Sequence, residues 1–155
     1  MTHLNSVNDL REYIKGLGEF RARPIVAGQH PTLYIDHSQG AMIKGIREKD
    51  YLFSPCKNWV EPHEQMGLSF SAGWNHLKDQ IKLKRKWNKD KSIDINWLLA
   101  SFELPAGLRF VQDTRDSQHY LLTVTERMTI DALVAKLLMI ADRMAVYPHV
   151  ERFLK

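Results

Sequence analysis

The chain has 155 residues, of which 44% are hydrophobic, and a formal net charge of +4. A chain of this length can bury a core without metal or disulfide support, so we expect residues 1–155 to form one domain. No apolar run approaches the roughly 18 residues of a membrane span, and the N-terminus lacks the pattern of a classical signal peptide. We therefore expect a soluble protein without membrane insertion, which leaves a cell only by a route that does not read such a signal.

The cysteine count indicates the cellular compartment, and the distribution of charge indicates the kind of partner. Cys56 is the only cysteine, so no internal disulfide can form, and the scattered histidines lack zinc-site spacing. We expect a reducing, cytoplasmic compartment and no bound metal. The positive charge is local, because residues 75–91 contain seven Lys and Arg against two Asp, while the rest of the chain is close to neutral. Such a segment favours an acidic partner, either nucleic acid or protein.

The first elements along the chain are a helix and a strand. Ser6 fits an N-cap, and apolar residues at helical spacing follow it until Gly16, which predicts a short amphipathic helix. Residues 20–27 alternate apolar and basic side chains, which predicts a strand. Pro24 cannot donate to a ladder, so this run is either an edge strand or a strand that begins beyond the proline.

The middle of the chain predicts a loop and a basic helix. Residues 48–66 show no regular period and contain two prolines, which predicts an ordered loop that could border a pocket. Residues 67–71 form a short strand-like run, and Trp74 and Trp87 then follow one face of a helix whose other face is filled by lysines. We expect this helix to pack through its tryptophans and to show its basic side to water.

The C-terminal half predicts further strands and a last helix. Residues 93–104 are apolar and β-branched enough for a strand buried on both faces, although residues 97–102 alone also fit a helix. Residues 104–128 alternate apolar and polar side chains on both sides of a polar turn, which predicts a β-hairpin. Thr129 fits the N-cap of a final amphipathic helix. The fold class is α+β, with N-terminal, central basic and C-terminal helices packed against the sheet.

Few residues point to chemistry on their own, and none of the common nucleotide, metal or nucleophile motifs is present. Most histidines occur in polar or loop contexts without a second metal ligand nearby, and we interpret them as surface residues: His30, His37, His63, His76 and His149. His119 differs, because it lies beside Tyr120 within the predicted hairpin, where an imidazole must find a hydrogen-bond partner or line a cavity. The basic helix is either a solvated face or a surface for phosphates or an acidic protein.

Several short motifs follow one another in a recognisable order. An early strand carries Arg21 and Arg23, a loop-rich middle leads to the run Gly67-Leu-Ser-Phe-Ser71, and the hairpin with His119 and Tyr120 precedes a methionine-led final helix. This order resembles a family of small bacterial toxins that are exported by type VI secretion and act in the cytoplasm of rival cells. The fold of that family is similar to that of ADP-ribosyltransferases.

The resemblance implies a split, strongly bent, mostly antiparallel sheet whose cleft holds NAD as a substrate. An arginine of the first strand, here Arg21 or Arg23, is then expected to hold the ribose or the diphosphate, since a guanidinium offers forked donors to diphosphate oxygens. The run of Ser69, Phe70 and Ser71 is expected to shape the nicotinamide pocket. No metal takes part.

The implied reaction separates nicotinamide from ribose through an oxocarbenium-like transition state. His119, Tyr120 and Ser71 are the catalytic residues that the resemblance implies. A transferase normally has a glutamate on the third motif strand, and here Tyr120 stands in its place. Glu103 and Glu126 are acids near this strand, and either could reach the cleft, although the spacing does not place either of them there.

These expectations define one function and two alternatives. The first is a growth-inhibiting toxin of interbacterial competition, with NAD-dependent ADP-ribosyltransferase-like activity on an unidentified protein or nucleic acid and with a cognate immunity protein as partner. The second is a small ribonuclease toxin, in which the basic helix positions RNA and His119 acts with Arg115 or Lys91. The third is a non-catalytic module that binds an acidic protein or nucleic acid through the basic helix alone.

Overall fold

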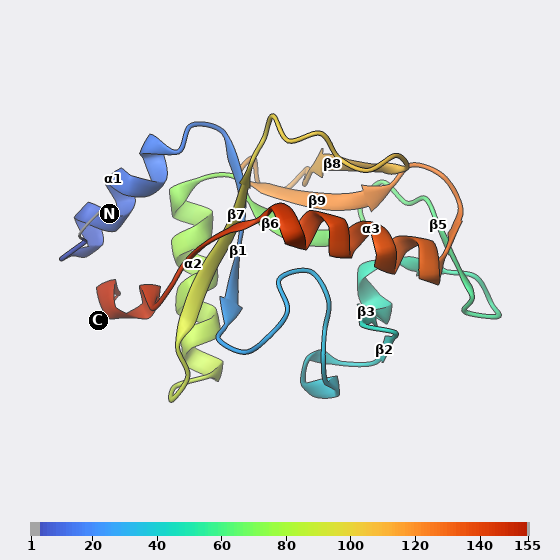
Figure 1. Ribbon diagram of the computed structural model, residues 1–155, viewed down its shortest axis with the longest axis horizontal. Coiled ribbons are helices and arrows are strands. Elements are labelled where there is room, and N and C mark those ends of the chain that lie inside the picture. The colour runs from blue at the N-terminus through green and yellow to red at the C-terminus, as the bar shows by residue number, and fades with distance from the viewer. Residues whose placement is uncertain (1–3, 155) are drawn as a thin grey trace.

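A six-stranded antiparallel sheet organises the computed structural model, which describes residues 4–154 (Figure 1). Across the sheet the strands are β11 (Ala145–Tyr147), β7 (Ile93–Leu99), β1 (Phe20–Val26), β6 (Leu68–Ser71), β9 (His119–Val124) and β8 (Leu108–Gln112). Every pairing within it is antiparallel. The predicted α+β fold with a mostly antiparallel sheet is confirmed.

Shorter elements complete the described part of the chain. The helices are α1 (Val7–Gly16), α2 (Trp74–Trp87) and α3 (Ile130–Arg143), with short 3-10 turns η1 (His37–Gln39), η2 (Glu48–Asp50) and η3 (Val150–Phe153). One small sheet pairs β2 (Met42–Ile43) with β3 (Ile46–Arg47), and another joins β10 (Met128–Thr129), β5 (Trp59–Glu61) and β4 (Leu52–Phe53). Within residues 4–154, none of these helices has the length and apolar character needed to cross a membrane.

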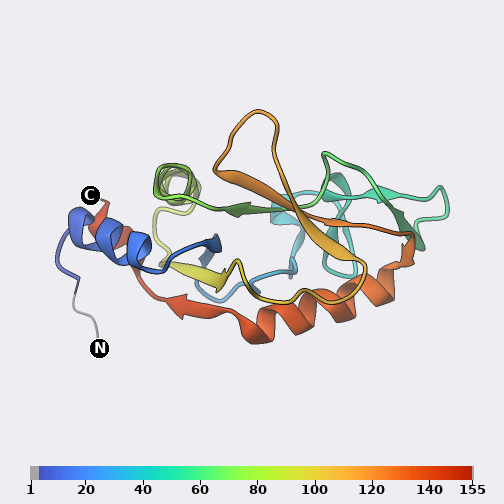
Figure 2. The same ribbon diagram turned by 90° about the horizontal axis from the view of Figure 1, so that it is seen from above.

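Helices α2 and α3 lie on opposite faces of the six-stranded sheet (Figure 2). On one face, α2 buries Leu77 and Ile81 together with residues of α1, β1 and β7. On the other face, α3 buries Leu133 and Leu137 together with residues of β6, β8 and β9. Each face of the sheet therefore has its own apolar core, and β7 contributes to both, with Leu98 in the core of α3 and Ile93 and Ile95 in the core of α2.

The sheet is divided between β1 and β6. β1 pairs with β7 over all seven of its residues, but with β6 only at Ala22↔Ser71. Beyond that pair, no described strand forms a ladder with the β6 side of β1, and this is where Pro24 lies. The expectation of an edge strand, or of one starting beyond the proline, is wrong, because a proline is tolerated where one side of a strand is left unpaired.

The hairpin and the last helix form as predicted. β8 and β9 pair from Leu108↔Val124 to Gln112↔Tyr120. The hydroxyl of Thr129 accepts a hydrogen bond from the backbone N–H of Ala132 at 3.1 Å, which caps α3.

The expected packing of α2 through both of its tryptophans is only half right. Trp74 is buried at the start of the helix, whereas the side chain of Trp87 is 74% exposed at its end. The reason is that α2 extends beyond the core it covers, so its last turn meets a hollow and water instead of a packed layer.

Candidate functional site

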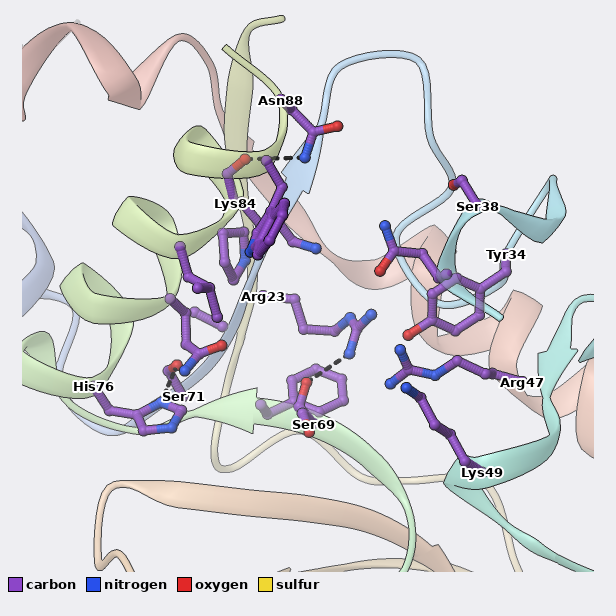
Figure 3. A pocket seen from close by; sticks show the side chains of 17 residues that line it. Arg23, Tyr34, Ser38, Arg47, Lys49, Ser69, Ser71, His76, Lys84 and Asn88 are labelled. Carbon is purple, nitrogen blue, oxygen red and sulfur yellow. Dashed lines mark hydrogen bonds between the residues drawn. The ribbon is translucent and has the colours of Figure 1, made fainter. Parts of the chain in front are cut away.

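A cavity of about 620 Å³ opens where β1 and β6 separate (Figure 3). Strands β1 and β6 contribute Arg23, Ser69 and Ser71, while α2 forms one wall and the segments around η1 and β3 contribute to the opposite side. The basic groups of the lining are Arg23, Arg47, Lys49, Lys84 and His76. No carboxylate among the described residues lines it, so the cavity attracts anions.

Arg23 bridges the gap in the sheet. Its side chain is largely buried, with 8% of the residue exposed. Its Nε donates to the carbonyl oxygen of Pro31 at 2.9 Å, and its Nη1 donates to that of Ser69 at 2.6 Å. These two bonds hold the guanidinium across the opening, where Figure 3 shows it pointing into the cavity.

A chain of polar contacts runs from the cavity wall to a buried carboxylate. The Oγ of Ser71 lies 2.6 Å from Nδ1 of His76, and the ring of His76 stacks on that of His119 with a centroid distance of 4.8 Å. The Nδ1 of His119 in turn lies 2.8 Å from Oδ2 of Asp113. Asp113 also accepts hydrogen bonds from the backbone and side chain of Arg115. The positions of both imidazoles are therefore fixed.

Burial and the neighbouring charge of His119 lower the pKa of His76. The backbone N–H of His76 donates to Oε1 of Gln118 at 3.0 Å, which ties the start of α2 to the residue before β9. Since its ring is half-buried and its pKa is below the ordinary value, His76 is a neutral imidazole at neutral pH. A neutral imidazole 2.6 Å from a hydroxyl can accept a proton at the cavity wall.

The cations of the cavity are close enough to influence one another. Burial, followed by the charges of Arg23 and Arg47, lowers the pKa of Lys84 to about 8. Nη2 of Arg47 donates to Oδ1 of Asp50 at 2.8 Å, but its buried Nε has no hydrogen-bond partner within the described chain. Positive charges held together in this way are stabilised when an anion enters.

The structure brings five of the predicted site residues to this region. Arg23, Ser69, Phe70 and Ser71 line the cavity. His119 does not line it, but stacks on His76, which does.

The other predicted residues lie elsewhere. The guanidinium of Arg21 sits 3.9 Å from the ring centroid of Tyr120, and its Nη1 donates to the carbonyl oxygen of Phe20. Neither Arg21 nor Tyr120 lines the cavity, and the same is true of Glu103 and Glu126. Arg21 and Tyr120 thus stack on each other instead of converging with the serines.

Sequence reasoning missed the contribution of α2. His76 and Lys84 were expected at the surface and in water, and both line the cavity. A helical period does connect the residues that α2 contributes to the lining: His76, Gln80, Leu83, Lys84 and Trp87. They follow at i, i+4, i+7, i+8 and i+11, which is one face of a helix. A helix face that mixes polar and apolar residues in this way was the sequence signal that could have indicated a cavity wall.

Comparison of the chain with models of known protein families, with curated proteins and with solved structures gave no match. The site is therefore described by its own geometry. Within residues 4–154, His, Cys, Asp and Glu side chains form no group of three or more that could hold a metal ion. The arrangement offers anion binding by guanidinium and ammonium groups, together with a hydroxyl and imidazole pair.

Proposed function

We propose that this protein is a growth-inhibiting toxin that binds NAD in the cavity, has ADP-ribosyltransferase-like activity and acts in the cytoplasm of a target cell. One observation carries the proposal: the sheet divides between β1 and β6, and Arg23 and the run Ser69 to Ser71 meet at that division. A split sheet with an arginine on one strand and two serines on the next is the arrangement that the resemblance implies for an NAD site.

In the proposed complex Arg23 binds the diphosphate. Its Nε and Nη1 are fixed by backbone carbonyl groups, which leaves Nη2 as a preoriented donor, since no acceptor among the described residues bonds to it. Lys84 supplies a second positive charge from the facing helix. Fixed donors of this kind favour diphosphate oxygens without the entropic cost of ordering a flexible side chain.

His76 is the group best placed for proton transfer. In the proposed reaction the bond between nicotinamide nitrogen and ribose carbon breaks, and nicotinamide leaves with the electron pair. The acceptor then bonds to that carbon and gives its proton to Nε2 of His76, in the tautomer whose Nδ1–H donates to the hydroxyl oxygen of Ser71. Ser71 orients this ring at 2.6 Å, and His119, through stacking, is a positioning residue. The lining contributes no carboxylate from residues 4–154, so the Ser71 and His76 pair supplies its electron-rich atoms.

The test is incubation of purified protein with labelled NAD and bacterial lysate. Wild type is expected to release nicotinamide and to transfer label, and Ser71→Ala and Lys84→Gln are expected to lower the rate at least about tenfold. Lys82→Gln is the matched control, because Lys82 is exposed on the same helix and lies outside the cavity. Absence of both NAD cleavage and NAD binding in wild type would contradict the proposal.

A ribonuclease is the second candidate, and the observation that favours it is the presence of His76 beside the cation cluster. In such a cleavage His76 takes the proton of the ribose 2′-hydroxyl, the 2′-oxygen bonds to phosphorus while the cations hold the phosphate, and the bond to the 5′-oxygen breaks, with that oxygen taking a proton from water. The residues first considered for this role lie apart, because the side chain of Arg115 is 86% exposed and bonds to Asp113, and Lys91 lines a smaller cavity. RNA cleavage without NAD, weakened steeply by salt, would favour this candidate.

A further inference from the structure

The positive charge of the cavity lining is greater than NAD needs. Arg23, Arg47, Lys49 and Lys84 enter the lining from three separate segments of the chain. NAD has a negatively charged diphosphate, but its pyridinium ring is positive, and no described carboxylate in the lining faces such a ring. A ligand whose charged groups are all anionic, or that has an added phosphate, balances the site better.

The cations approach the cavity from two sides. Figure 3 shows Arg47 and Lys49 reaching in from β3 and the segment after it, opposite α2, which supplies Lys84. Arg23 lies between them on β1. The buried carboxylate of Asp50 already pairs with Nη2 of Arg47 at 2.8 Å. A diphosphate held by Arg23 and Lys84 therefore leaves Lys49 as the cation on that side without an anion.

A buried donor without an acceptor among the described residues lies on that second side. The Nε of Arg47 is buried and has no hydrogen-bond partner in residues 4–154. A buried donor without an acceptor costs free energy that an incoming phosphate oxygen removes. Lys49 is exposed beside it, and no described carboxylate forms an ion pair with its ammonium group.

We infer that the cavity selects a nucleotide with a phosphate beyond the diphosphate that Arg23 binds, and that Arg47 and Lys49 receive this further phosphate. Among dinucleotides this chemistry is that of NADP, whose 2′-phosphate adds about −1.5 to −2 charges at neutral pH. Trp87 and Leu83, both exposed at the rim, provide apolar surface on which a base can stack. The inference rests on the proposed function, because it uses the same cavity.

The test compares the binding of NAD, NADP and ATP to the full chain by isothermal titration calorimetry. NADP is expected to bind about tenfold more tightly than NAD, because its additional phosphate forms one further ion contact in a partly buried site. Lys49→Gln is expected to reduce the ratio of the two affinities to about twofold or less. Lys82→Gln removes the same charge from an exposed position outside the cavity and is expected to keep the full ratio. Circular dichroism checks that each variant is folded.

The outcomes separate the inference from the proposed function. Equal affinities for NAD and NADP in wild type overturn the inference and leave the NAD proposal standing. Binding of ATP without either dinucleotide supports the further phosphate and overturns the NAD proposal. Binding of none of the three overturns both. A preference for NADP that survives Lys49→Gln overturns the assignment to that side of the cavity.

Discussion

Lys84 is the residue whose protonation responds most directly to a bound anion. Its pKa in the free protein is lowered to about 8 by burial and by the charges of Arg23 and Arg47, and Lys49 and His76 also line the cavity. A bound phosphate favours the ammonium form and raises that pKa, so binding takes up protons above about pH 8. Nucleotide affinity is therefore expected to fall as the pH rises through about 8, and calorimetry in buffers of different ionisation enthalpy measures the proton uptake.

The control for this prediction is Lys84→Arg, since a guanidinium remains charged throughout the range. This variant is expected to keep its affinity at high pH and to lose the proton uptake. If its pH profile follows that of wild type, the titrating group is another one and the assignment to Lys84 is wrong.

Asp113 links the acid stability of the fold to the imidazole pair. Hydrogen bonds from the side chain and backbone of Arg115, together with one from His119, hold the pKa of this buried carboxyl well below its ordinary value. A carboxyl with a depressed folded-state pKa stabilises the fold fully above its unfolded-state pKa of about 4, and this contribution is lost as the pH falls below that value. We expect Asp113→Asn to lower the free energy of unfolding by about 1 kcal/mol at neutral pH, since exposed Arg115 is screened by water.

The measurement is urea unfolding of wild type and Asp113→Asn at neutral and acidic pH. The difference between the two proteins is expected to shrink as the pH falls below about 4, because the wild-type carboxyl is then progressively protonated. A difference that stays constant or grows in acid would contradict the role given to the Asp113 charge.

At the scale of elements, the cap of α3 is a local feature with a measurable contribution. The Thr129 hydroxyl satisfies the N–H of Ala132, which has no acceptor within the helix. Thr129→Ala is expected to lower the free energy of unfolding by about 1 kcal/mol. The matched control is Thr125→Ala, which removes the same atoms from an exposed position before the helix and is expected to change the free energy of unfolding by less than about 0.5 kcal/mol. Chemical denaturation of both variants provides the comparison, and equal losses would contradict the capping role.

The elements that could be predicted from the sequence are those whose signal is local. The hairpin of β8 and β9 has a period of two on each side of a polar turn, and α3 has a cap followed by a wide apolar stripe. β1 could be predicted as a strand, but its place inside the sheet could not. Pro24 lacks a backbone N–H on one edge of β1 only, so the strand can still pair along its other edge. The sequence does not show that β6 pairs with β1 at Ala22 alone and so leaves the edge at Pro24 unpaired.

The candidate site was less predictable, because it is assembled from contacts between distant segments. Arg23 and the serines of β6 could be named from short motifs, but Tyr120 could not be placed, since one residue along a strand reverses the face. Arg47 lies next to an irregular segment without a period to indicate where its side chain points. The contact between Ser71 and His76 depends on the geometry of the short connection from β6 to α2, and no local sequence pattern predicts that geometry.

At the scale of the whole molecule, the divided sheet places a positive cavity beside the basic helix α2, whose Lys84 lines it. A toxin of the proposed kind needs an immunity protein in the cell that produces it. We propose that this partner covers the cavity with acidic side chains, since these complement Arg47, Lys49 and Lys84. Association is then expected to weaken with rising salt concentration, mainly through a slower association rate.

Inducible expression in the bacterial cytoplasm tests the molecule as a whole. Wild type is expected to arrest growth, and Ser71→Ala and Lys84→Gln are expected to relieve the arrest, because one removes the hydroxyl that orients His76 and the other removes a cation from the cavity. Lys82→Gln should remain toxic, since the loss of one exposed charge outside the cavity leaves the site intact. If Lys82→Gln relieves the arrest as fully as Lys84→Gln, the whole basic face of α2 acts and the cavity does not. A harmless wild type would favour a non-catalytic module that binds an acidic partner, because the same cations would then serve binding alone.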